Sequence, residues 1–163
     1  MDEQREGVIV VGVDGTPGSG AALDFALAEG LSRGSAGEVV TGWLLSSPSD
    51  GLGHQSKLAE GRAVMERMQD AALTAAFARL GATPSVTRYV VHDYAGRVLV
   101  ARSEHASLVV VGGGTQNPSS RKSVGSVAEY VVRHAVAPVV VVPDPARARR
   151  RASRDSVVTV AAS

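Results

Sequence analysis

The chain has 163 residues, 44% apolar and 20% charged, a composition typical of one globular domain with a sizeable core. Aromatic residues make up only 4%, which argues against a surface that stacks nucleic-acid bases. The net charge is +1 and there is no cysteine, so disulfides, thiolate catalysts and cysteine metal sites are excluded.

The elements alternate along the chain, because apolar runs typical of strands buried on both faces are followed by segments of helical periodicity. The predicted strands cover residues 8–13, 38–45, 86–91, 108–112 and 139–142. The predicted helices cover residues 17–33, capped by Thr16 and followed by Gly34, then 57–80, ended by Gly81, then 94–105 and 126–134; residues 46–56 are expected to form an exposed loop. This order predicts an α/β fold with a mostly parallel sheet.

The two ends of the chain are more polar than the segments between them. Residues 144–163 hold five arginines and two aspartates, which leaves the body mildly acidic. We expect one domain over residues 1–144 and an arginine-rich, flexible tail over 145–163, with nucleic acid not the expected partner. The polar start MDEQREG and the absence of an apolar run near ~18 residues predict a cytoplasmic protein without a membrane span.

Ligands of open parallel sheets bind beyond the carboxyl ends of the strands, where the strand order reverses. Asp14 ends the first predicted strand, and the glycine-rich loop 112–126 follows the fourth. If these strands are neighbours, Asp14 faces the loop, where it can accept ribose hydroxyls or help to hold a divalent cation. Backbone N–H groups of the glycines and of the helix that starts near Ser126 would bind phosphates.

Each of these residues also has a purely structural interpretation. Asp14 can cap the first helix, and Ser126 with Glu129 has the spacing of a capping box. Arg121 and Lys122 can neutralise phosphates or simply be solvated.

Several enzyme classes are excluded by single positions. Gly12 stands where a DxDGT phosphatase needs its nucleophilic aspartate, and Lys122-Ser123 lacks the glycine that precedes the lysine of a Walker loop. The glycines at 15, 18 and 20 run in the reverse order of the dinucleotide fingerprint. The four histidines have no metal-ligand spacing, and no general base is positioned to activate water, so any ATP hydrolysis should be slow.

The spacing of the glycine loop carries a family resemblance. Gly112, Gly125 and Ser126 match the pattern G-x2-G-x9-G-[ST], with Thr115 at the second glycine. The chain therefore resembles the nucleotide-binding branch of the universal stress protein family. The likeness runs from Gly7 to Pro143 and includes VVGVDGT, LVVVG and PVVVVP.

The resemblance implies a Rossmann-like open five-stranded parallel sheet with helices on both faces, ATP binding with Mg, and a homodimer through the edge strand from Val139 to Val142. Asp14 is the residue that could contact nucleotide-bound Mg, and no metal site made of protein side chains alone is expected. The nucleotide-binding residues that it implies are Gly12, Val13, Asp14, Leu44, Val111, Gly112, Gly113, Thr115, Gly125, Ser126 and Val127.

The expected role is regulatory, through nucleotide-dependent conformation or choice of partner in a stress response. The alternative is an interaction protein of the same fold that binds no nucleotide, because Thr115 places a Cβ where the pattern has glycine. A third option is nucleic-acid binding through the arginines of residues 147–154.

Overall fold

The computed structural model describes residues 7–46, 53–114, 124–147, 149–150 and 152–153. Within these residues, strands and helices alternate as the sequence predicts. The strands are β1 (Val8–Gly12), β2 (Gly37–Gly42), β3 (Val86–Val91), β4 (Ala106–Gly113) and β5 (Val139–Pro143); the helices are α1 (Pro17–Arg33), α2 (His54–Leu80), α3 (Ala95–Arg102) and α4 (Ser126–His134). Among the described helices, none combines the length and apolarity needed to cross a membrane.

The five strands form one parallel sheet in the order β3-β2-β1-β4-β5, which confirms the predicted fold class. The chain moves outward from β1 through β2 to β3 and then returns to place β4 on the other side of β1. The strand order therefore reverses between β1 and β4, and these two strands are neighbours. This arrangement opens a crevice at their carboxyl ends, where ligands of such sheets bind.

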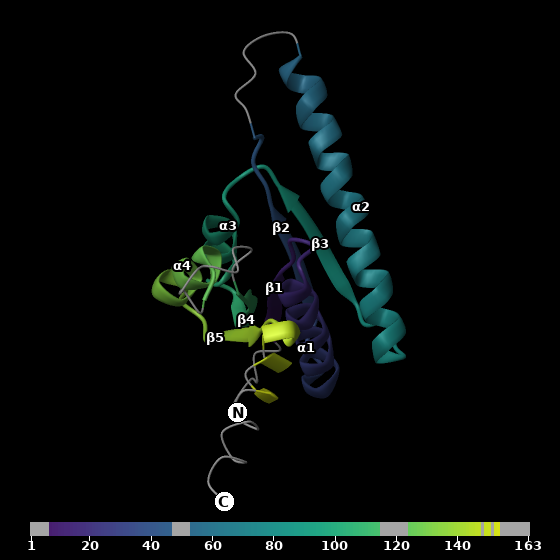
Figure 1. Cartoon of the computed structure of the whole chain (residues 1–163), viewed down its shortest axis with the longest axis vertical. Helices are drawn as coiled ribbons and strands as arrows, with labels where there is room; N and C mark the ends of the chain where they lie inside the picture. The colour runs from purple at the N-terminus through teal and green to yellow at the C-terminus, as the bar shows by residue number, and fades with distance from the viewer. Residues whose placement is uncertain (1–6, 47–52, 115–123, 148, 151, 154–163) are drawn as a thin grey trace, which may run out of the picture.

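Two helices cover each face of the sheet (Figure 1), because successive strand residues point to opposite faces. Ile9 packs with Leu23 of α1 and Leu73 of α2 in one core. Val10, its neighbour in β1, packs with Leu99 of α3 in the other. The continuous apolar runs of the central strands are thus explained by burial on both sides.

Helix α2 is attached to the sheet through Gln69, which is fully buried. Its amide nitrogen lies 3.1 Å from the Thr41 hydroxyl and 3.2 Å from the carbonyl oxygens of Val39 and Tyr89. Thr41 in turn donates a 2.8 Å hydrogen bond to the carbonyl oxygen of Val13, just beyond β1. This chain of polar contacts fixes the end of β1 from the α2 side of the sheet.

Most predicted boundaries hold within two residues, and three need correction. The strand predicted over residues 38–45 ends at Gly42, which pairs with Val91, the last residue of β3. Helix α2 begins at His54, not at Lys57, so the last residues predicted as loop form its first turn after Gly53. Helix α3 is shorter than predicted and ends at Arg102, because the Ser103 hydroxyl bonds back to the Val100 carbonyl and stops the helix. The helix ends predicted at Gly34 and Gly81 are confirmed, and both glycines have a left-handed φ of 68°.

Candidate functional site

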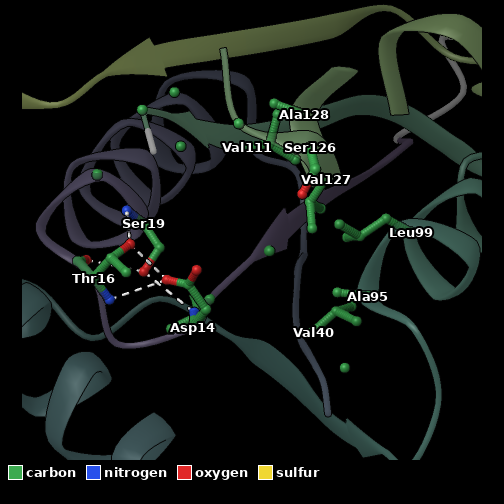
Figure 2. Close-up of a pocket in the computed structure, with 18 of the residues that line it drawn as sticks. Asp14, Thr16, Ser19, Val40, Ala95, Leu99, Val111, Ser126, Val127 and Ala128 are labelled. Carbon is green, nitrogen blue, oxygen red and sulfur yellow. Dashed lines mark hydrogen bonds between the residues drawn. The ribbon is translucent and has the colours of Figure 1, made fainter. Parts of the chain in front are cut away.

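A cavity of about 710 Å³ lies at the carboxyl ends of β1 and β4, a volume typical of small-molecule sites. Figure 2 shows Asp14, Thr16 and Ser19 on one side of it and Ser126 and Val127 on another. All the described members of the predicted site line the cavity: Gly12, Val13, Asp14, Leu44, Val111, Gly112, Gly113, Gly125, Ser126 and Val127. Thr115, the remaining member, lies outside the described residues.

The Asp14 side of the cavity is held by hydrogen bonds within the turn that follows β1. One carboxylate oxygen, Oδ1, accepts from the Thr16 backbone N–H at 3.0 Å and from the Thr16 hydroxyl at 2.6 Å. The Asp14 N–H donates to the Ser19 hydroxyl at 3.2 Å. Thr16 caps α1, as predicted, so the interpretation of Asp14 as the cap is wrong. None of the described residues donates a hydrogen bond to the second carboxylate oxygen, Oδ2.

The opposite side of the cavity is the start of α4. Its N-cap is Gly125, and no described side chain caps this end of the helix. The expected capping box is wrong, because Ser126 is already the first helical residue and the Glu129 carboxylate pairs with Arg133 at 2.7 Å. The first backbone N–H groups of α4 therefore face the cavity without a side-chain cap, in an arrangement that favours an anion.

The glycine run at the end of β4 is needed first by the fold itself. A Cβ on Gly112 would lie 2.5 Å from the Gly18 carbonyl carbon, and one on Gly113 would lie 2.9 Å from the Val141 side chain. Gly114 has a φ of +129°, which side-chain-bearing residues rarely adopt. The glycines are therefore required by contacts within the chain itself, whether or not they also admit a ligand.

The walls between these two sides are apolar. Val40 of β2 and Leu99 of α3 line the cavity and belong to the core cluster against which Val127 packs. Figure 2 shows Leu99 beside Val127 and Val40 beside Ala95. At Gly42 a Cβ would lie 2.4 Å from the Ala95 Cα, so glycine lets α3 start close to β2 and closes the cavity on this side. Lining residues that the sequence interpretation missed are Thr16, Pro17, Gly18, Ser19, Val40, Gly42, Trp43, Asp93, Tyr94, Ala95, Leu99, Gly114, Ala128 and Asp144.

Trp43, the single tryptophan of the chain, also lines the cavity. Its ring lies against α2, where a Cβ on Gly61 would come within 2.4 Å of it. The His92 ring meets it edge-on, with 4.7 Å between centroids. Because no other tryptophan contributes, the tryptophan fluorescence reports on the surroundings of this one side chain, which include the cavity.

The charged side chains among the described lining residues of the cavity are all acidic. Its described lining residues include the carboxylates Asp14, Asp93 and Asp144 and no lysine, arginine or histidine. Within the described part of the chain, no three acidic or histidine side chains converge as a set of metal ligands. Arg121 and Lys122, considered as phosphate contacts, lie outside the described residues.

The sequence matches the family model described as "Universal stress protein family" over residues 7–143. It is 29% identical over 159 residues to universal stress protein Mb2019 of Mycobacterium bovis, covering 87% of this chain and 50% of that protein. It is 31% identical over 144 residues to universal stress protein Rv2623 of Mycobacterium tuberculosis, covering 86% and 46%. The chain thus spans about half the length of the curated relatives it matches.

Solved structures share the fold. UspA from Lactobacillus plantarum aligns with a TM-score of 0.64 and 19% identity over 86% of this chain and 99% of that chain. A universal stress protein in complex with cAMP aligns with a TM-score of 0.57 and 22% identity over 85% and 97%. The Archaeoglobus fulgidus protein in complex with dAMP aligns with a TM-score of 0.56 and 22% identity over 82% and 95%.

Proposed function

The chain belongs to the universal stress protein family, and on that premise we propose that its cavity binds an adenine nucleotide and that occupancy controls a regulatory role in stress response. One observation carries the proposal. Asp14 and the start of α4, which no described side chain caps, face each other across an apolar-walled cavity of nucleotide size, at the crevice between β1 and β4. Solved relatives with cAMP and dAMP support the ligand class.

The cavity divides into regions suited to the parts of a nucleotide. The apolar wall formed by Val40 and Leu99, together with the exposed Leu44, suits the adenine ring. The free oxygen of Asp14 suits ribose hydroxyls, because an ionised carboxylate is a strong acceptor. The N–H groups at Ser126 and Val127 suit a phosphate.

Among adenine nucleotides, we propose ATP with Mg as the specific ligand. Backbone N–H groups at the α4 start would bind the phosphates, and Mg, if bound, would neutralise their charge and contact Asp14. The regulatory role that we propose depends on occupancy of the cavity and not on turnover. The cysteine-free sequence supports a cytoplasmic location.

A homodimer through β5 is a separate proposal. β5 is an edge strand, and its residues from Val139 to Val142 are only half-buried. Val132 and Val136, on and just after α4, are 54% and 75% exposed. An apolar edge of this kind invites antiparallel pairing with a second copy. Light scattering at tens of micromolar should give twice the chain mass, and Val132→Lys, at an exposed position, should reduce it to the mass of one chain. A monomeric wild type would contradict the proposal.

The competing function is an interaction protein whose cavity binds no nucleotide, and the residue that favours it is Thr115. Titration of the Trp43 fluorescence with AMP and with MgATP separates the two. We expect a saturable change for the wild type, and Thr115→Gly should alter the dissociation constant by no more than about threefold. If only Thr115→Gly binds nucleotide, the competing function is correct.

A further inference from the structure

Asp144 is a cavity residue for which the family pattern of glycines gives no role. It follows directly after β5, whose last residue, Pro143, pairs with Gly113 of β4. A Cβ on Gly114 would lie 3.4 Å from the Asp144 Cβ. Asp144 therefore lies beside the backbone of the glycine run, at the rim of the cavity.

The start of α4 lies against the same glycine. A Cβ on Gly125 would lie 2.5 Å from the Gly114 carbonyl oxygen. Asp144 and the first turn of α4 thus both adjoin Gly114. A phosphate held by the N–H groups of that turn would lie near the Asp144 carboxylate, and each further phosphate would add negative charge to this region.

No basic side chain among the described lining residues offsets this charge. The described lining includes three aspartates and no basic side chain. Of the three, only Asp93 has an ion-pair partner among the described residues, Arg97 at 3.9 Å. Asp144 uses Oδ1 to accept a 2.9 Å hydrogen bond from the Ala146 N–H, which orients its carboxylate without neutralising it.

We propose that Asp144 determines phosphate-chain specificity: its carboxylate disfavours nucleoside polyphosphates, so the site takes a nucleotide with one phosphate readily and takes ATP only as a complex with a divalent cation. This inference rests on the proposed function. Its physical basis is the repulsion between like charges in a partly buried site, where screening by solvent and salt is weaker than at an open surface.

The hydrogen bond to Ala146 offers a variant that isolates the charge. Asp144→Asn keeps a side-chain oxygen for the Ala146 N–H, as asparagine caps turns about as well as aspartate. Glu104→Gln, at an exposed position that does not line the cavity, removes the same charge elsewhere and serves as the matched control.

The experiment measures dissociation constants of adenosine, AMP and ATP for the full chain at low salt, in EDTA and with excess Mg. In EDTA the wild type should bind AMP more tightly than ATP, and Mg should remove most of the difference. Asp144→Asn should tighten metal-free ATP by about five- to tenfold, AMP by about twofold, and leave adenosine unchanged. Glu104→Gln should change none of the three by more than about twofold.

Two results would overturn the inference while leaving the proposed function intact. One is metal-free ATP binding the wild type at least as tightly as AMP. The other is Asp144→Asn shifting adenosine as much as ATP, which would mark Asp144 as structural only. If none of the three ligands binds the folded chain, the proposed function fails, and the inference fails with it.

Discussion

Replacing Gly112 by alanine should lower the free energy of unfolding by about 3 kcal/mol, the upper range for forced overpacking. The added Cβ would lie 2.5 Å from the Gly18 carbonyl carbon and 2.7 Å from the Ser19 nitrogen. Both atoms belong to the backbone of the first turn of α1, which cannot rotate away as a side chain would. Because Ser19 also bonds Asp14, the cavity should loosen with the helix. Urea unfolding followed by circular dichroism measures the loss.

Gly20, which lies in α1 two residues after Gly18, provides the matched control. A Cβ built there meets no atom within 4 Å, so Gly20→Ala should stabilise the chain by about 0.5 to 1 kcal/mol through helix propensity. If Gly112→Ala were as stable as the wild type, the close contact between β4 and α1 would be wrong, and with it the position of the glycine loop.

Replacing Asp14 by alanine should weaken adenosine binding by about 10- to 100-fold, the range for losing a hydrogen bond to a charged acceptor. Adenosine is the ligand to use, because removing a carboxylate also helps any anion to bind. Oδ1 already accepts two hydrogen bonds from Thr16, so Oδ2 is the oxygen that would accept from the ribose hydroxyls. The alanine variant loses this acceptor. The Trp43 fluorescence provides the binding signal.

Two controls separate ribose recognition from loop geometry. Asp14→Asn keeps Oδ1 for the Thr16 turn but presents an amide in place of Oδ2, and we expect it to lose nearly as much affinity as alanine. The wild type should bind a 2′-deoxy or 3′-deoxy analogue more weakly than adenosine, and Asp14→Ala should bind them within about threefold of each other. Full discrimination in Asp14→Ala would place the ribose elsewhere.

The sequence predicted the fold well because its signals are local and repeated. Continuous valine runs such as that of β4, helix ends at Gly34 and Gly81, and the Thr16 cap each identify an element without knowledge of its neighbours. The strand order then brings Asp14 next to the glycine loop, as the site prediction required.

The sequence could not separate the two uses of glycine. The glycine run at the end of β4 predicts close approach by a ligand, whereas in the structure Gly112 adjoins α1 and Gly113 adjoins β5. Those neighbours come from segments far along the chain, so no local pattern reveals them. The capping box was wrong for a local reason, because the N-cap is Gly125 and Glu129 pairs with Arg133 one turn further along α4.

Other cavity residues were missed because they carry no motif. Val40 and Leu99 read as core valine and leucine, and only the meeting of β2 with α3 brings them to the cavity. Asp144 is the last residue of the predicted domain and belongs to no motif, and only the pairing of β5 with β4 places it beside the glycine run.

Binding of an adenine nucleotide in the cavity between β1 and β4 can be measured by equilibrium dialysis of the purified, nucleotide-free chain against labelled AMP and labelled MgATP. Dialysis counts bound ligand whatever the heat or spectral change of binding. We expect one nucleotide per chain, with a dissociation constant below about 100 μM. No bound nucleotide at millimolar concentration, in a chain whose circular dichroism shows the α/β fold, would contradict this expectation.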